Sequence, residues 1–479
     1  MTLDRQAQCP SCGAPITFKF GGARAQVCGY CRFVVARTDR GLEKLGRMAD
    51  LLELPSPLAV GFGGFWGPKR FEVEGRVQYD RVGAASAPWQ EFLLGFPEDG
   101  STCWVASAQG RWYATREVPA LGAPSSDYLR PGETIDLGPQ GVWVVQEVGR
   151  RQLKSAQGNL TGIPNPDVVT RFADLSGAKG RFATLDYGDG SEPPQLFVGY
   201  QFDPAEIKLD SGAPLDQPSA QVKDVQCPNC GGNLPLLSER AERVVCQYCG
   251  MQSDLRQGHL EALGPTPPPA IPPTIPIGAE AVLRGVKVVC CGFVVRSCMV
   301  EGERYPWTEY LLWAGPSAGY WWLMEEEGAW WLVTPLEPGD VLDSNHAATY
   351  RGESYAWKQQ VTARVDHVVG EFYWKVVIGE SVEATEFEGP GGKLSRERAK
   401  TEIAYSFCGG FSPQELAAFG IKPPAGAVGG AASGGSSGCG TIAIVLLVLL
   451  AIVIVIALAD CSSGGGGGGG YYGGGYYSK

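Results

Sequence analysis

Apolar and polar residues alternate along much of the chain with the two-residue period of a strand that buries one face. The clearest case lies between residues 71 and 80, where charged or amide side chains separate the apolar ones. The apolar residues of this segment are Phe71, Val73, Val77 and Tyr79. The alternation predicts a half-buried strand here, and similar segments recur further along the chain.

Two hairpins are predicted where such segments are separated by two residues. Segments 104–108 and 111–116 flank Gln109-Gly110, and segments 320–326 and 329–334 flank Glu327-Gly328. A two-residue loop that ends in Gly is typical of a β-hairpin. Further strands are predicted at 142–148, 182–187, 373–378 and 402–406. The predicted fold class is therefore mainly β.

Few segments favour a helix. Apolar residues three or four positions apart predict a short amphipathic helix within residues 38–57. These residues are Leu42, Leu45, Met48, Leu51 and Leu52. Residues 204–207 and 413–419 each predict a single closing helical turn.

An unbroken run of 18 apolar residues extends from Ile442 to Ala459. As a helix it would be about 27 Å long, close to the thickness of the bilayer core. Fourteen of these residues are Ile, Leu or Val, and their summed insertion free energy is about −4 to −8 kcal/mol. The run predicts a single C-terminal transmembrane α-helix at 441–459. The Gly/Tyr-rich tail that follows has little to bury and is expected to be disordered.

Eight cysteines follow one spacing twice, C-x2-C-x15-C-x2-C, which is typical of a zinc ribbon. They are Cys9, Cys12, Cys28 and Cys31, and then Cys227, Cys230, Cys246 and Cys249. A segment of about 25 residues buries too little surface to fold alone, so a metal would supply its folding energy. The sequence predicts two structural Zn²⁺ ions. Disulfides, free thiols and a rubredoxin-like iron site are the alternatives.

The two cysteine motifs are 218 residues apart, and other segments repeat at the same offset. Residues 88–94 (PWQEFLL) match residues 306–312 (PWTEYLL), and Gly110-Arg-Trp112 matches Gly328-Ala-Trp330. A repeat of this length predicts a tandem duplication of a ribbon followed by a larger β domain. Each larger domain is expected to be an antiparallel β-barrel or β-sandwich.

Linkers complete the predicted domain organisation. Residues 264–277 contain seven Pro, which predicts a stiff spacer. The predicted parts are ribbon 1–37, helix and linker 38–57, β domain 58–210, ribbon 211–256, Pro-rich linker 257–276, β domain 277–420, Gly/Ser linker 421–440, transmembrane helix 441–459 and tail 460–479.

Charge argues against nucleic acid as a partner. The formal net charge is −11, which disfavours binding along a phosphate backbone. The first ribbon has a small basic excess and the second has none. We therefore expect a protein partner for the ribbons.

The Pro-Trp-x-Glu-[Phe/Tyr]-Leu-Leu segments, the Trp-rich hairpins and the segments 202–206 and 411–415 resemble the bacterial family called domain of unknown function 4178. The resemblance covers residues 58–210 and 277–420 and is closer in the second copy. It implies two tandem copies of the family domain, each after a four-cysteine zinc ribbon, with a C-terminal membrane helix. It implies no activity.

The expected location follows from the cysteines and the apolar run. The first twenty residues contain no apolar segment of a secretory signal. Metal-binding thiols favour a reducing compartment. The prediction is a protein of the bacterial cytoplasmic (inner) membrane, with residues 1–440 cytosolic and the short tail outside.

A repeated pair offers a further candidate site, in Trp89-x-Glu91 and Trp307-x-Glu309. Residues two apart on a strand share a face, so a carboxylate lies beside an indole. Such a pair can bind a cationic ligand, or the Glu can be a structural partner of the backbone or of an Arg.

A catalytic role is not expected, because His259, His346 and His367 have no counterparts in the first copy. Cys290, Cys291 and Cys298 are expected to be buried thiols. The sequence predicts a non-enzymatic binding or scaffolding protein. The alternative is a small-molecule sensor or carrier with a barrel cavity near the Trp-x-Glu strand.

Overall fold

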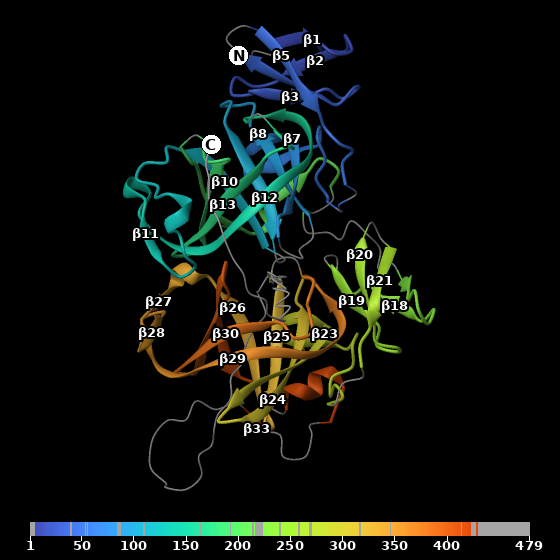
Figure 1. Cartoon of the computed structure of the whole chain (residues 1–479), viewed down its shortest axis with the longest axis vertical. Helices are drawn as coiled ribbons and strands as arrows, with labels where there is room; N and C mark the ends of the chain where they lie inside the picture. The colour runs from blue at the N-terminus through green and yellow to red at the C-terminus, as the bar shows by residue number, and fades with distance from the viewer. Residues whose placement is uncertain are drawn as a thin grey trace, which may run out of the picture.

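The computed structural model describes residues 5–429 apart from short internal stretches. These stretches are 39–40, 53, 55, 84–87, 109–110, 163, 192, 213–214, 216–223, 239–240, 257–258, 268–270, 316–317, 345, 413 and 423–427. Within the described residues, two closed eight-stranded antiparallel barrels lie one above the other along the long axis, and each carries a small ribbon (Figure 1).

Barrel 1 comprises residues 63–209. Its barrel strands are β7 (Lys69–Arg81), β8 (Trp89–Gly95), β9 (Thr102–Ala108), β10 (Arg111–Val118), β12 (Val142–Leu160), β13 (Val169–Gly177), β14 (Arg181–Gly188) and β15 (Gln195–Phe202). The smaller elements are β6 (Gly63–Trp66), η1 (Ser126–Tyr128), β11 (Thr134–Asp136), η2 (Gly138–Gln140), η3 (Pro204–Glu206) and β16 (Ile207–Leu209).

Barrel 2 comprises residues 280–410. Its barrel strands are β23 (Val286–Val300), β24 (Glu303–Trp313), β25 (Tyr320–Glu326), β26 (Ala329–Leu336), β29 (Glu353–Phe372), β30 (Ser381–Gly389), β31 (Gly392–Arg398) and β32 (Ile403–Gly410). The smaller elements in and after it are β22 (Glu280–Leu283), η4 (Pro338–Asp340), β27 (Val341–Asp343), β28 (Ala347–Tyr350), η5 (Glu415–Phe419) and β33 (Val428–Gly429).

The two barrels have the same strand order. Barrel 1 runs β7-β8-β9-β10-β15-β14-β13-β12, and pairing of β12 with β7 closes it. Barrel 2 runs β23-β24-β25-β26-β32-β31-β30-β29, and pairing of β29 with β23 closes it. Counted along the chain, both orders are 1-2-3-4-8-7-6-5. The predicted alternation, both predicted hairpins and the mainly β class are confirmed.

Each ribbon joins the sheet of the barrel that follows it in sequence. Ribbon 1 comprises β1 (Arg5–Gln8), β2 (Pro15–Phe18), β3 (Ala25–Val27), β4 (Phe33–Thr38) and β5 (Gly41–Arg47), and ribbon 2 comprises β17 (Asp224–Gln226), β18 (Asn233–Pro235), β19 (Arg243–Val245), β20 (Met251–Arg256) and β21 (His259–Pro265). Strand β3 pairs with the end of β12, and β19 pairs with the end of β29. The ribbons are thus continuous with the barrels.

Glycine marks the point at which each long strand exchanges neighbours. Gly158 of β12 has φ +78° and pairs with both Gly75 of β7 and Val27 of ribbon 1. A Cβ on Gly158 would lie 2.2 Å from the carbonyl oxygen of Glu74. Gly370 of β29 repeats this arrangement with φ +93°. Only glycine lets three strands converge at these points.

Direct contacts join the two barrels. The backbone N–H of Val148 donates to the carbonyl oxygen of Thr401 at 2.8 Å. The N–H of Gly339, in η4, donates to Oγ of Ser176 at 3.0 Å. Arg111 of barrel 1 forms a largely buried ion pair with Glu337. These contacts hold the two barrels together.

Two local predictions are wrong. The predicted helix within 38–57 is instead strand β5, because residues 41–47 pair with β4 in a hairpin that satisfies their backbone groups. The predicted strand 373–378 is irregular after Phe372. There Tyr373 stacks on Tyr320 at 4.3 Å and Trp374 packs edge-on against Phe372 at 5.1 Å. The apolar residues of this segment pack as a loop.

The membrane-spanning prediction is corrected. Among the described residues no helix is long and apolar enough to cross a membrane. The segment 441–459, most of the linker 421–440 and the tail 460–479 lie outside the described residues. The fold class is therefore corrected to a mainly β chain, without the predicted transmembrane helix. The membrane as a partner and the inner-membrane location rested on that helix, and neither is supported.

Candidate metal centres and the Trp-x-Glu networks

The four cysteines of ribbon 1 converge from the ends of its short strands. Cys9 and Cys12 occupy the turn between β1 and β2, and Cys28 and Cys31 occupy the turn between β3 and β4. The Sγ atoms of Cys9 and Cys31 are 3.6 Å apart, and those of Cys12 and Cys28 are 3.7 Å apart. All four sulfur atoms lie within 4.8 Å of one another.

Ribbon 2 repeats this cluster. Cys227 and Cys230 lie between β17 and β18, and Cys246 and Cys249 lie between β19 and β20. The Sγ atoms of Cys227 and Cys249 are 3.6 Å apart, and those of Cys230 and Cys246 are 3.8 Å apart. The structure therefore brings together all eight cysteines that the sequence selected.

These separations fit a bound metal ion. A disulfide has an S–S distance of about 2.05 Å, and all eight thiols are free. Four thiolates arranged tetrahedrally about 2.3 Å from a metal ion are about 3.8 Å apart. Each cluster can therefore hold one tetrahedral ion. Its four positions would all be filled by cysteine, which leaves no open position for a substrate.

The backbone of each turn forms the same bond around the cluster. The carbonyl oxygens of Cys9, Cys28, Cys227 and Cys246 each accept a hydrogen bond from the N–H four residues later, at 2.8–2.9 Å. The donor has a positive φ in every case and is glycine in three of them. The fourth is Arg32, with φ +58°, in a region that residues other than glycine rarely adopt.

Ribbon 2 also has a side-chain donor to a sulfur atom. Nδ2 of Asn229 lies 3.5 Å from Sγ of Cys249. This bond and one from the backbone of Met251 lower the pKa of the Cys249 thiol to about 6. A lowered pKa favours the thiolate, which is the form that binds metal.

In barrel 1 the predicted Trp-x-Glu pair is part of an ionic network. Nε1 of Trp89 donates to Oε1 of Glu91 at 2.9 Å. The guanidinium of Arg151 lies 3.4 Å from Glu91 and 2.6 Å from Asp186. Arg151 also lies over the ring of Tyr79, 4.2 Å from its centroid. The cation beside Glu91 is therefore a side chain of the protein itself.

Barrel 2 has the equivalent network, more deeply buried. Nε1 of Trp307 donates to Oε1 of Glu309 at 2.7 Å. Arg296 lies 3.6 Å from Glu309 and 2.8 Å from Glu397. Since β23 and β31 are not neighbours in the sheet, the Arg296–Glu397 pair crosses the barrel interior. Burial raises the pKa of Glu397 to about 7, although Arg296 counteracts it.

Sequence reasoning missed both arginines and their second carboxylates. Arg151 comes from β12, the fifth barrel strand, whereas Arg296 comes from β23, the first. A repeat search could not pair them, because they do not occupy equivalent positions. Glu91 and Glu309 do occupy equivalent positions, and the sequence repeat therefore revealed them.

The remaining cysteines and histidines do not form a further cluster with metal-ligand distances among the described residues. Cys103, Cys290, Cys291, Cys298 and Cys408 are buried. Burial raises the pKa of the Cys103 and Cys298 thiols to about 11. It also lowers the pKa of His367.

Two clefts lie at the junction of the barrels, and neither is lined by Glu91 or Glu309. The first has a volume of about 420 Å³ and lies between residues 130–133 and 398–400. The second has a volume of about 340 Å³ and lies between β7, β12, β13, η1 and Thr401. Arg81 and Phe172, which line the second cleft, lie 5.8 and 6.4 Å from the ring centroid of Trp89. The second cleft therefore borders the barrel 1 network but does not reach its carboxylate.

Comparison with known proteins gives one match. A family model described as domain of unknown function (DUF4178) matches residues 276–408, from just before β22 to within β32. No curated protein and no solved structure matches. The family match does not extend to barrel 1, so two tandem copies of the family domain are not supported by it.

Proposed function

We propose that this chain is a non-catalytic binding or scaffolding protein, that its partner is another protein, and that the partner docks on the ribbons. One observation carries the proposal. Both ribbons present the same exposed surface, composed of an edge strand with an outward leucine and a tyrosine at the tip of a cysteine turn.

The edge strands are β5 in ribbon 1 and β21 in ribbon 2. Each is the last strand of its sheet and, within the described residues, pairs on one side only. Their sequences share Leu-Glu-x-Leu-Gly at the 218-residue offset, residues 42–46 and 260–264. The outward leucines are Leu45, 49% exposed, and Leu263, 54% exposed.

The tyrosines lie close to the ends of these strands. Tyr30 is 78% exposed and Tyr248 is 64% exposed. The N–H of Met48, just after β5, bonds to the carbonyl oxygen of Arg32, and that of Thr266 bonds to Gly250. The edge strand thus returns to the cysteine turn that carries the tyrosine.

A free edge with outward apolar side chains is suited to accept an extended peptide as an additional strand. One exposed leucine on a protein surface has no special meaning. Here the leucine, the tyrosine and the free edge recur together in both ribbons, which favours a docking role.

Zinc is the ion we propose for both clusters. Four thiolates in a closed tetrahedral set suit a structural zinc ion, and iron is the alternative for the same donors. The ion would fix the cysteine turn that carries the tyrosine and the end of the edge strand that bonds to this turn. Its role would be to hold the docking surface in shape.

The shared strand order supports a second proposal, that barrel 1 and barrel 2 arose by duplication. The Trp-x-Glu pair occupies the second barrel strand in both cases. A ribbon strand joins the fifth barrel strand in both cases.

The ionic networks support the non-enzymatic interpretation, because the charged groups of each network pair with one another.

The sensor alternative is less well supported. A cationic ligand beside Glu91 or Glu309 would have to replace Arg151 or Arg296. Both arginines already bridge two carboxylates.

Affinity purification of the full chain from its native cells, with quantitative mass spectrometry, tests the docking proposal. We expect proteins that are retained by the wild type and lost with the combined Leu45→Asp and Leu263→Asp variant. Leu121→Asp is the matched control, because Leu121 is 60% exposed on barrel 1. If the same proteins are retained by the ribbon variant, or lost equally in the control, the ribbons are not the docking surface.

A further inference from the structure

We propose that the first cleft between the barrels binds a small phosphate-bearing molecule. The cleft is formed by both barrels. Barrel 1 contributes residues 130–133, between η1 and β11, and barrel 2 contributes residues 398–400, at the end of β31. The inference is independent of the ribbons and of the proposed protein partner.

Three cationic side chains line this cleft, Arg130, Arg398 and Lys400. All three are exposed. None takes part in an ion pair recorded among the described residues. The chain as a whole carries a net charge of −11, so a concave site with three unpaired cations is a local exception. Clefts with charge of one sign concentrate ligands of the opposite charge.

Arg130 is held in place without being neutralised. Its Nη1 donates to the carbonyl oxygens of Asp127 and Leu129, both at 2.8 Å. The Asp127 carboxylate pairs instead with Arg171, at 2.6 Å. A guanidinium fixed by carbonyl oxygens keeps its charge for an anion.

Arg398 lines the cleft from the side of barrel 2. A Cβ on Gly132 would lie 2.9 Å from Nη2 of Arg398 and 2.8 Å from Cδ1 of Ile403. Gly132 has φ +87°. The backbone of barrel 1 thus approaches the guanidinium of barrel 2 closely, and the cleft exists only while the barrels are joined.

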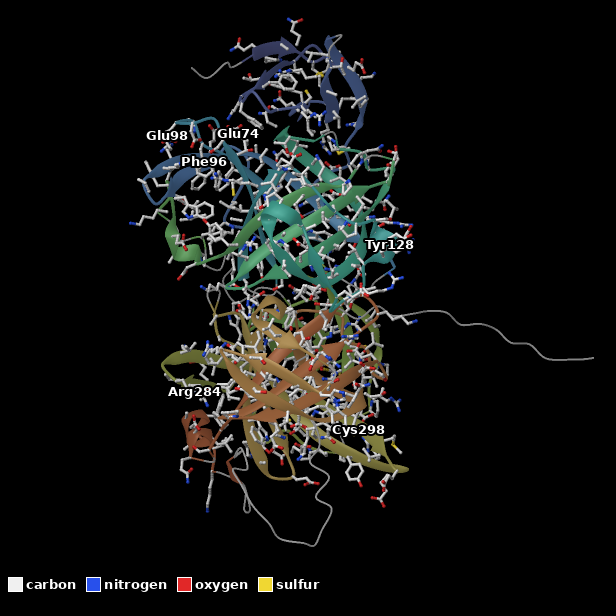
Figure 2. All side chains as sticks on the ribbon, turned by 90° about the vertical axis from the view of Figure 1, so that its left-hand side faces the viewer. Glu74, Phe96, Glu98, Tyr128, Arg284 and Cys298 are labelled. Atoms are coloured by element: carbon white, nitrogen blue, oxygen red, sulfur yellow. The ribbon has the colours of Figure 1, made fainter. Side chains whose placement is uncertain are left out.

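The volume of about 420 Å³ is in the range of small-molecule sites. The second cleft continues it, since Leu129 and Thr401 line that cleft next to Arg130 and Lys400. Figure 2 shows Tyr128, from the adjoining η1, on the surface just above the junction of the barrels. A phosphate among the three cations with a less polar remainder over Leu129 and Phe172 fits this groove.

One carboxylate, Glu133, also lines the cleft. Its negative charge repels an anionic ligand, so removing that charge should strengthen binding where removing a cation weakens it. Titration of the full chain with inorganic pyrophosphate, followed by calorimetry at low ionic strength, is the measurement. We expect one saturable site per chain.

Arg398→Ala and Lys400→Ala should each weaken pyrophosphate binding about fivefold or more, since loss of about 1 kcal/mol corresponds to that factor. Glu133→Gln should strengthen it. Arg284→Ala is the matched control, because Arg284 is exposed on barrel 2 far from the junction (Figure 2). Added salt should weaken wild-type binding more than that of the cleft variants. Unchanged thermal unfolding would show that each variant is folded.

The proposal fails if pyrophosphate does not saturate a site, or if Arg284→Ala weakens binding as much as the cleft variants do. It also fails if a single-stranded oligonucleotide binds through these residues while pyrophosphate does not, because the cleft would then be part of a nucleic-acid surface.

Discussion

The indole Nε1 of Trp307 donates a 2.7 Å hydrogen bond to Oε1 of Glu309, two residues further along β24. Trp89 and Glu91 form the same bond in barrel 1. Because alternate residues of a strand share a face, the motif places an indole and a carboxylate side by side inside each barrel. An arginine of the chain then compensates the charge. These contacts favour the structural interpretation of the motif.

Glu309→Ala should lower the free energy of unfolding of barrel 2 by about 3–5 kcal/mol, because it leaves Arg296 without one of its two buried carboxylates. Glu91→Ala should cost less, about 1–3 kcal/mol, since the Glu91 side chain is 22% exposed. Tryptophan fluorescence during urea unfolding measures both. Glu309→Gln, which keeps an acceptor for Trp307, is the control. Stable alanine variants would reverse the structural interpretation.

Local patterns in the sequence predicted much of the fold. The two-residue alternation identified β7, and the Glu327-Gly328 turn is formed with both residues at positive φ, as a tight hairpin requires. The cysteine spacing predicted both clusters because four ligands of one ion must be near in sequence when the domain is small. Each of these signals is short-range.

The missed features depend on contacts between distant segments. Nothing near Arg296 in sequence indicates Glu397, which is 101 residues away. Leu42 and Leu45 have helical spacing, yet β4 provides a partner for that segment and the hairpin forms instead. The charged cleft at the barrel junction combines Arg130 and Arg398, from different barrels. Periodicity cannot reveal such pairs.

Metal analysis should find about two equivalents per full chain purified without chelator, one for each four-cysteine cluster. We expect zinc and little iron, measured by plasma mass spectrometry. Cys31→Ser and Cys249→Ser should each remove one equivalent, since three thiolates hold the ion less well. Cys103→Ala should retain both, because Cys103 is a buried thiol outside the clusters. One equivalent or fewer in the wild type contradicts the paired sites.

Stability should fall as pH rises from 6 to 9, in part because of Glu326. Burial raises its pKa from 4.5 to about 9, while Lys393 opposes the shift and Glu386 adds to it. Between these values the folded chain binds a proton that the unfolded chain has lost, so stability declines with pH through this window and levels off above it. Urea midpoints at pH 6, 7, 8 and 9 measure the decline.

Glu326→Gln should reduce that slope, because the amide does not titrate. Glu301→Gln is the control, since Glu301 is an exposed carboxylate in the turn between β23 and β24. Equal slopes in the wild type and Glu326→Gln would show that Glu326 ionises in the folded chain as it does in the unfolded one.

The last prediction concerns the junction that creates the cleft. A Cβ on Gly339 would lie 2.4 Å from the carbonyl carbon of Gly177, and this contact is backbone, which cannot rotate away. Gly339→Ala should therefore separate the barrels locally at a cost of about 1–3 kcal/mol. Hydrogen exchange should accelerate at Gly339 and Val148, whose N–H groups bond across the junction, while amides within each barrel stay protected. Gly162→Ala, at a position with open space, should leave exchange unchanged. Pyrophosphate binding should weaken in Gly339→Ala and not in Gly162→Ala, because Arg130 and Arg398 face one ligand only when the barrels are held together. Unchanged hydrogen exchange in Gly339→Ala would mean that the barrels are not in contact there.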